Sequence, residues 1–280
     1  MRFQVDKDVR DVVVIIGVGG MGRAIARRIG SGRKLLLADV SDAALDVADV
    51  LRGEGQDVAT QVVDVSSRES VAALADTAAG LGRVTQVAHT AGLSPTQAST
   101  EAILRVDLLG VALVLDEFAR VIAPGGAGVI IASMSGYLAG LTPDQESAAA
   151  TVPTDELLDL PFFAPDVLGS PGAAYALAKR ANIVRVQASA AAWGERGARI
   201  NSISPGVIST PMGQGELSGE SGAQMRAMVA MSAAKRLGTP DDIAAAAAFL
   251  LGQDATYVSG TDLLVDGGTV AAVRRLLPTG

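Results

Sequence analysis

Tyr175 and Lys179, in the stretch YALAK, are the residues whose types and spacing most directly suggest chemistry. Residues four apart lie on the same face of a helix, so the phenol and the ammonium group can act together. The chain has no cysteine, which excludes a thiolate nucleophile, and His89 is its only histidine. We expect no metal site, because a catalytic zinc normally needs several His or Cys ligands. We therefore expect acid–base chemistry to use Tyr, Lys, Asp or Glu.

A glycine-rich loop near the start of the chain could hold a dinucleotide. Gly17, Gly19 and Gly22 form the pattern G-x-G-x-x-G between an apolar run and a helical pattern, with Gly20 and Met21 inside it. The first glycine permits a tight turn, the second lets a phosphate approach the backbone, and the third allows close packing of helix and strand. The free N–H groups at the start of the helix then face the pyrophosphate.

An acidic residue follows at the end of the next apolar run, KLLLAD, where Asp39 stands. A carboxylate at this position accepts hydrogen bonds from a ribose diol and repels a 2′-phosphate. Val40 and Ser41 supply no cation, and Arg33 and Lys34 are predicted at the far end of the strand. We therefore favour NAD over NADP as the cofactor. The alternative is that Asp39 only caps the following helix.

Apolar runs bounded by glycine or polar residues alternate with alanine-rich helical patterns along the chain. This alternation predicts βαβ units and a parallel sheet with helices on both faces. Seven strands are expected: Val12–Gly17, Lys34–Ala38, Asp57–Val63, Val84–Thr90, Gly128–Ala132, Ala198–Ile203 and Asp262–Val265. A long helix is expected over Ala174–Trp193. No second domain with its own core is apparent.

Two segments interrupt this alternation. Residues 137–171 are rich in Pro, Asp, Glu and Ser and are expected to form a mostly irregular excursion near the active site. Connections of this length are uncommon unless they act as lids or binding loops. Residues 213–233 carry Met225, Met228 and Met231 at helical spacing. These methionines are either ordinary core contacts or part of a flexible cover over the substrate.

Composition narrows the possible partners. With 49% hydrophobic and 19% charged residues, disorder is not expected. A net charge of −7 argues against nucleic acid or an anionic membrane as a partner. No apolar run approaches the roughly 18 residues that span a bilayer. The first residues, MRFQVDKDVRD, are too charged for a signal peptide. We therefore expect a soluble cytoplasmic protein.

Seven motifs together resemble the short-chain dehydrogenase/reductase family over about residues 11–268. In family order they are HTAG, VDLLG, IASMSG, YALAK, RINSISPGVISTPM, RLGTPDDIAAAAAFLL and YVSGTDLLVDGG. The resemblance implies one Rossmann-type α/β domain over residues 1–280, with a doubly wound, seven-stranded parallel sheet and helices on both faces. It also implies a nicotinamide cofactor and the interconversion of an alcohol and a carbonyl.

The resemblance assigns catalytic roles to three residues. Ser133 corresponds to the family's serine and would hold the substrate oxygen, while Tyr175 would be the acid/base. Lys179 would bind the nicotinamide ribose and lower the pKa of the tyrosine. An ammonium about 4 Å away favours the phenolate by about 4 kcal/mol, or roughly three pKa units.

The resemblance also assigns cofactor contacts beyond the glycine loop and Asp39. Tyr175 and Lys179 are included for the nicotinamide ribose. The remaining positions, on the adenosine and nicotinamide sides, are Asp64, Val65, Ala91, Gly92, Pro205, Gly206, Ile208 and Thr210.

Three departures from the family pattern stand out. The glycine loop is one residue shorter than usual and lacks the threonine, so its geometry is nearer the general Rossmann pattern. His89 and Thr90 stand where the family often has two asparagines, and we expect His89 to be a partly solvated residue at a strand end. Asp107 stands where an asparagine usually holds a water in a proton relay. An ionised Asp107 would raise the pKa of Tyr175, so we expect a working but altered relay.

The excursion separates Ser133 from Tyr175 by 42 positions. A comparable insertion occurs in bacterial 3α-hydroxysteroid dehydrogenase/carbonyl reductases, which the stretch SPGAAYALAKRA also resembles. We therefore favour a hydrophobic secondary alcohol or ketone as substrate, steroid-like or terpenoid. Candidate pocket residues are Ser135, Phe162, Phe163, Leu168 and Met212. The alternative is that the insertion only covers surface or shapes an interface.

The family resemblance implies assembly through the helices that carry VDLLG and YALAK. We expect a homotetramer, with a dimer as the alternative because the insertion could obstruct this contact. A different class of function also stays open, namely a cofactor-binding redox sensor with little turnover.

Overall fold

The computed structural model describes residues 10–41, 43–219 and 221–276. In this part of the chain, seven parallel strands form one sheet in the order β3-β2-β1-β4-β5-β6-β7. The strands are β1 Asp11–Ile16, β2 Lys34–Asp39, β3 Asp57–Val62, β4 Arg83–His89, β5 Ile122–Ile131, β6 Arg199–Pro205 and β7 Asp262–Val265. The predicted doubly wound fold is confirmed.

Six of the seven strands lie within two residues of their predicted bounds, but β5 begins six residues earlier than predicted. Its first half reads IAPGG, which carries no apolar pattern. The segment is nevertheless held in the sheet beside β4, where the register shifts between Val84 and Gln86. Pairing with a neighbouring strand, rather than local propensity, therefore sets the start of β5.

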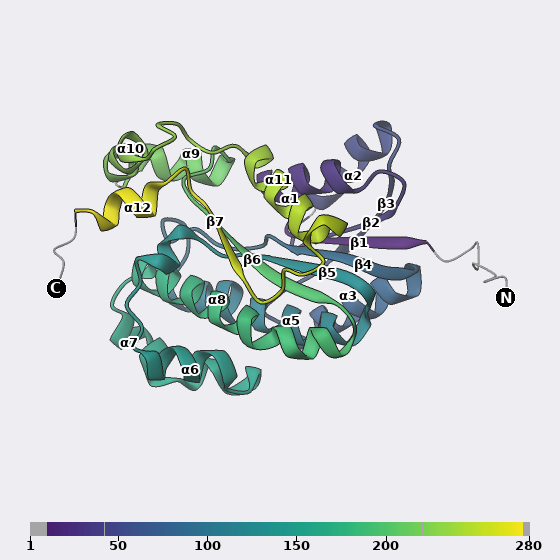
Figure 1. Cartoon of the computed structure of the whole chain (residues 1–280), viewed down its shortest axis with the longest axis horizontal. Helices are drawn as coiled ribbons and strands as arrows, with labels where there is room; N and C mark the ends of the chain where they lie inside the picture. Colours follow the sequence, from purple (N-terminus) through teal and green to yellow (C-terminus); the bar gives the residue numbers. More distant parts are fainter. Residues whose placement is uncertain (1–9, 42, 220, 277–280) are drawn as a thin grey trace.

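Helices cover both faces of the sheet, as Figure 1 shows. α1 Gly20–Ile29, α2 Ala43–Gly53 and α11 Pro240–Leu251 pack on one face, and α3 Arg68–Leu81, α5 Gly110–Val121 and α8 Pro171–Glu195 on the other. The strands are apolar on both sides; β1, for example, reads DVVVII and is buried from its second residue onward. The buried residues of α1 are Gly22, Ile25, Ala26 and Ile29. Their spacing places them on one face of the helix, which packs on the sheet.

The remaining short elements lie around these layers. They are α4 Thr100–Ile103, η1 Leu104–Leu109, η2 Met134–Tyr137, α6 Pro143–Thr151, η3 Thr154–Asp159, η4 Pro161–Phe163, α7 Pro165–Leu168, α9 Pro211–Ser218, α10 Gly222–Met231, η5 Gln253–Ala255 and α12 Thr269–Arg274. Of these, α9, α10 and α12 gather beyond the carboxyl ends of the strands (Figure 1).

Both segments expected to be irregular are largely helical. In residues 137–171, Thr142 and Gln145 form a capping box at the start of α6, which packs on α8. Residues 213–233 lie mainly in α9 and α10. The expectation of irregular structure was therefore wrong. These short helices have weak amphipathic patterns and are stabilised by packing on their neighbours, α6 on α8 and α10 on α9 and α12.

Strand order reverses between β1 and β4, which are neighbours in the sheet although two other strands separate them in sequence. Open parallel sheets bind ligands outside the carboxyl ends of their strands at such a switch point. The glycine loop follows β1 and the HTAG stretch follows β4, so both flank this crevice. Within the described residues, no helix combines the length and apolar character needed to cross a bilayer.

Candidate active site

The glycine loop is fixed by contacts with the ends of two neighbouring strands. Gly17 has φ +86°, and a side chain there would collide with the backbone of Ala91. The Thr90 hydroxyl donates to the Gly17 carbonyl at 2.6 Å, and the Val18 N–H donates to Asp39 Oδ2 at 2.7 Å. These bonds hold the shortened loop in place without the threonine that is common in the family's loop.

Asp39 does not cap α2, which begins at Ala43. Its Oδ1 accepts from the backbone and hydroxyl of Ser41 at 3.3 Å, and its side chain lines a cavity of about 360 Å³. Lys34 lies at the opposite end of β2 and pairs with Asp57 at 2.6 Å. No lysine or arginine is among the described residues that line this cavity.

This first cavity fits the adenosine and pyrophosphate part of a dinucleotide. α1 starts on its wall without a side-chain cap or an acidic residue in its first turn, so its N–H groups are available to a phosphate. A Cβ on Gly19 would point into open space. All but one of the residues predicted for this half of the cofactor line the cavity; Gly22 instead packs against Gly17 and Thr90. The lining set is Gly17, Gly19, Gly20, Met21, Asp39, Asp64, Val65, Ala91 and Gly92.

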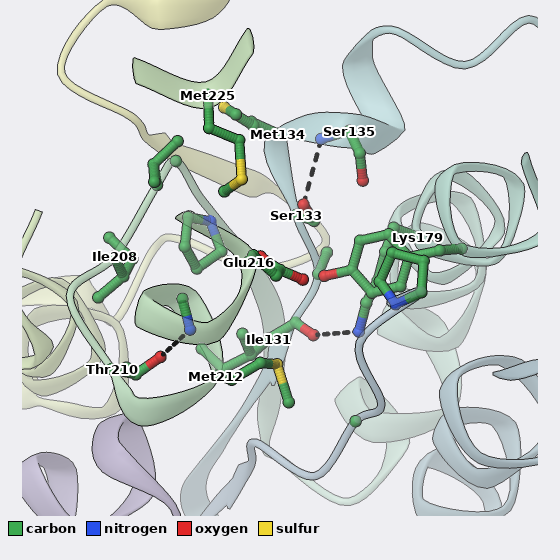
Figure 2. A pocket seen from close by; sticks show the side chains of 18 of the residues that line it. Ile131, Ser133, Met134, Ser135, Lys179, Ile208, Thr210, Met212, Glu216 and Met225 are labelled. Carbon is green, nitrogen blue, oxygen red and sulfur yellow. Dashed lines mark hydrogen bonds between the residues drawn. The ribbon is translucent and has the colours of Figure 1, made fainter. Parts of the chain in front are cut away.

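A second cavity of about 510 Å³ continues from the first, since Met21, Thr90, Gly92, Leu93, Thr210 and Met212 line both. Its walls include the residues predicted for the nicotinamide side and for catalysis. These are Asp107, Ser133, Tyr175, Lys179, Pro205, Gly206, Ile208 and Thr210. Figure 2 shows Ser133 and Lys179 on the same side of this cavity.

Ser133 and Tyr175 are brought together by the packing of η2 on α8. Gly136, in η2, lies so close to α8 that a Cβ at this position would be 2.9 Å from the backbone nitrogen of Arg180. Ser133 caps η2, where its hydroxyl accepts from the Ser135 N–H at 3.2 Å. The 41 intervening residues therefore do not keep the two side chains apart, and both side chains line the second cavity.

Lys179 lies beneath Tyr175, with its Nζ 5.3 Å from the centre of the phenol ring. It also donates to the Ile131 carbonyl at 3.4 Å (Figure 2). Burial raises the pKa of Tyr175, the charge of Lys179 opposes this, and Asp107 and Glu216 raise it further. The hydrogen bond with Ser133 also lowers this pKa, but the net shift is upward. The expected directions for Lys179, which lowers the pKa, and for Asp107, which raises it, both hold, and burial decides the net result. Burial outweighs the charge of Lys179, and the charge of Asp107 adds to the effect of burial.

Asp107 forms a direct ion pair with Lys179, with 3.1 Å between Oδ2 and Nζ, and both side chains are buried. Its Oδ1 accepts from the Leu93 N–H at 2.8 Å, and its backbone carbonyl accepts from Asn182 Nδ2 at 2.7 Å. Burial raises the pKa of Asp107. Burial alone would lower the pKa of Lys179, but the charge of Asp107 raises it overall.

His89 is fully buried rather than partly solvated, so that expectation is wrong. It ends β4 between Ile16 of β1 and Ile130 of β5, in the middle of the sheet. Neither ring nitrogen has a hydrogen-bond partner among the described residues. Burial, with a smaller effect from the charge of Lys179, lowers the pKa of His89 to about 3.

The predicted substrate residues divide into two groups. Ser135 and Met212 line the second cavity, but Phe162, Phe163 and Leu168 do not. These three pack into a separate apolar cluster with α8 residues such as Ala174 and Ala178. The prediction that they wall the substrate pocket is wrong, because the inserted helices pack their apolar side chains against α8, outside the cavity.

Several polar contacts at the site have no counterpart in the sequence prediction. Thr90 anchors the glycine loop, Asn182 donates to the Asp107 carbonyl, and Ser94 donates to Glu216 at the wall of the second cavity. Asn182 lies one helical turn beyond Lys179, so its face of α8 was predictable. Ser94 and Glu216 are 122 residues apart, and nothing in the sequence pairs them.

Known proteins match this chain over nearly its whole length. A family model described as short chain dehydrogenase matches residues 11–145, and one described as Enoyl-(Acyl carrier protein) reductase matches residues 158–270. The short-chain dehydrogenase/reductase bsc3 of Alternaria brassicicola is 44% identical over 95% of this chain and 98% of its own. The chain belongs to the short-chain dehydrogenase/reductase family.

Two further proteins are similar to this chain in sequence or structure and support its membership of the short-chain dehydrogenase/reductase family. The 3-alpha-hydroxysteroid dehydrogenase/carbonyl reductase of Comamonas testosteroni is 30% identical over 94% of this chain and 98% of its own. The crystal structure of levodione reductase superposes with a TM-score of 0.74 at 29% identity, covering 94% of this chain and 98% of that one. The chain is therefore an oxidoreductase of a family that uses NAD or NADP on small alcohols and ketones.

Proposed function

We propose that this protein transfers a hydride between NAD and a hydrophobic secondary alcohol or ketone, with a steroid-like or terpenoid compound as the favoured substrate. The observation that carries the proposal is the meeting of Ser133, Tyr175 and Lys179 at one cavity next to the glycine loop. The apolar lining of that cavity, including Met134, Met212, Met225 and Met228, supports a hydrophobic substrate.

A nicotinamide cofactor held by the glycine loop and Asp39 would supply or accept the hydride. Ser133 orients the substrate oxygen toward Tyr175. In reduction the Tyr175 phenol donates its proton to that oxygen, and in oxidation the phenolate removes it. Lys179 keeps its positive charge beneath the phenol. Because the pKa of Tyr175 is raised, the phenol stays protonated near neutral pH and can donate its proton in the reduction.

The preference for NAD rests on Asp39 and on its surroundings. The carboxylate lines the first cavity without a lysine or arginine among the described lining residues. It would accept from the ribose hydroxyls and repel a 2′-phosphate. We expect kcat/KM to be higher with NADH than with NADPH for any reducible ketone.

The test is a panel of cyclic, steroid and terpenoid ketones and alcohols, followed by the absorbance of the reduced nicotinamide with each cofactor. Tyr175→Phe should lower turnover by about 100-fold or more, while the affinity for NADH in a fluorescence titration stays unchanged. Retained turnover in Tyr175→Phe would assign the acid/base to another residue. Nicotinamide binding without turnover on any compound would favour the sensor alternative, which the Asp107–Lys179 ion pair also supports.

Residues 213–233 are proposed to cover the substrate. Met225 and Met228 line the second cavity, whereas Met231 is exposed. Residues 137–171 are proposed to act as an insertion beside the site that braces α8.

A homotetramer stays a prediction, and packing of α6 on α8 supports the dimer alternative. Light scattering should give about 113 kDa for the tetramer, four times the 28.3 kDa chain. Location in the cytoplasm also stays a prediction.

A further inference from the structure

Glu216 places a carboxylate in a cavity that is otherwise largely apolar. It lies on α9 and lines the second cavity together with Ser133 and Tyr175. Figure 2 shows its side chain pointing into the middle of the cavity. The cavity's other acidic residue, Asp107, is neutralised by Lys179. Glu216 makes no ion pair within the described residues.

One oxygen of this carboxylate is held in place by a buried serine. Ser94, which is 1% exposed, donates from Oγ to Glu216 Oε1 at 2.5 Å. A serine hydroxyl has one proton, so the Thr96 hydroxyl, 2.9 Å from Ser94 Oγ, must donate to it in turn. The Thr96 N–H also donates to Ser94 Oγ at 3.3 Å. These donors form one chain of hydrogen bonds that ends at Glu216 Oε1 and fixes that oxygen in place.

The second oxygen, Oε2, has no such partner in the described part of the chain and can accept a hydrogen bond from a ligand. The negative charge of Glu216 also reaches the reacting group, because it makes a small contribution to the raised pKa of Tyr175. A charged acceptor in a largely apolar cavity discriminates strongly between ligands that can and cannot donate to it.

We propose that Glu216, positioned by Ser94, forms a polar subsite that selects substrates carrying a hydroxyl group away from the reacting carbonyl. This inference rests on the proposed function and adds the chemistry of the substrate's far end. The preferred substrate is a hydrophobic ring ketone with a distal hydroxyl, whose O–H donates to Glu216 while its carbonyl meets Ser133 and Tyr175.

The turnover test compares isosteric substrate pairs, 3- and 4-hydroxycyclohexanone against 3- and 4-methylcyclohexanone. The wild-type protein should prefer the hydroxyketone in kcat/KM for at least one pair. Glu216→Gln keeps the size of the side chain and should lower this preference about tenfold, as expected for the loss of a charged acceptor. Ser94→Ala should lower it less. Met225→Leu, which changes the same cavity without a charge, should affect both ketones of a pair equally.

Equilibrium binding of the same ketones, measured by calorimetry, separates the two proposals. The protein is loaded with NAD+, which has no hydride to transfer to a ketone. Suppose that the wild type binds the hydroxyketone more tightly, that Glu216→Gln abolishes this preference, and that no ketone is turned over. This result would support the subsite and contradict the proposed function. An equal preference in the wild type and Glu216→Gln, or no preference in either measurement, would overturn the subsite. Glu216 would then serve only to attach α9 to Ser94.

Discussion

Asp107 gives the reacting tyrosine a buried acidic neighbour. Its carboxylate pairs with Lys179 at 3.1 Å and raises the pKa of Tyr175, although burial makes the largest contribution. Lys179 therefore has less influence on the phenol than it would beside a neutral asparagine. In this protein, the residue type at position 107 sets how strongly the lysine promotes proton removal.

Asp107→Asn should lower the pKa of Tyr175 and shift the pH profile of alcohol oxidation toward lower pH. Turnover below the pKa should rise up to about tenfold for each unit by which the pKa falls, because the phenolate fraction rises in proportion. The measurement is kcat against pH for both proteins. Asp116→Asn, which removes an exposed carboxylate from α5, is the control and should leave the profile in place. Loss of turnover at every pH in Asp107→Asn would assign a direct role to the carboxylate.

At the scale of elements, a buried arginine of α8, Arg185, attaches the inserted segment to that helix. Arg185 is 7% exposed and donates to the Ala149 and Val152 carbonyls at 2.9 and 3.1 Å, and to the Thr154 hydroxyl at 3.1 Å. The two carbonyls lie at the end of α6, where no later turn of helix satisfies them. One guanidinium therefore connects the inserted helices to the helix that carries Tyr175 and Lys179.

Arg185→Met should release this segment, because it leaves buried acceptors without donors. We expect a loss of about 2–4 kcal/mol in the free energy of unfolding. Limited proteolysis within residues 143–163 should also become faster. Arg105→Met is the matched control, since Arg105 pairs with exposed Glu101 at the surface; it should change neither quantity appreciably. Unchanged proteolysis in Arg185→Met would mean that the apolar cluster alone holds the insertion.

At the scale of the whole molecule, one buried group links stability to pH. His89 is fully buried in the middle of the sheet, and its pKa is lowered to about 3 from an ordinary value of 6.5. The unfolded chain therefore binds a proton between these values that the folded protein does not. Stability rises with pH through this window and is lost as the pH falls from about 6.5 toward 3.

His89→Leu should remove this dependence. As the pH falls below 6.5, the free energy of unfolding should decrease more steeply for the wild type than for the variant. The difference between the two slopes should be at most about 1.4 kcal/mol per pH unit. At pH 7 the variant should be as stable or more stable, because it no longer buries ring nitrogens without partners. Urea unfolding at several pH values measures both effects. Parallel curves for the two proteins would contradict the lowered pKa.

The family resemblance supplied most of the residues assigned to the two cavities. The sequence pattern by itself determined the parallel sheet, six of the seven strand bounds, the glycine loop with Asp39 and the pairing of Tyr175 with Lys179. These features depend on local patterns, namely apolar runs, glycine spacing and the four-residue step from Tyr175 to Lys179. The tertiary structure alone decided the burial of His89, the Asp107–Lys179 ion pair and the meeting of Ser94 with Glu216. It also placed Phe162 and Phe163 outside the cavity. Electrostatic environment and side-chain neighbours depend on which distant segments pack together, and no local pattern carries that information.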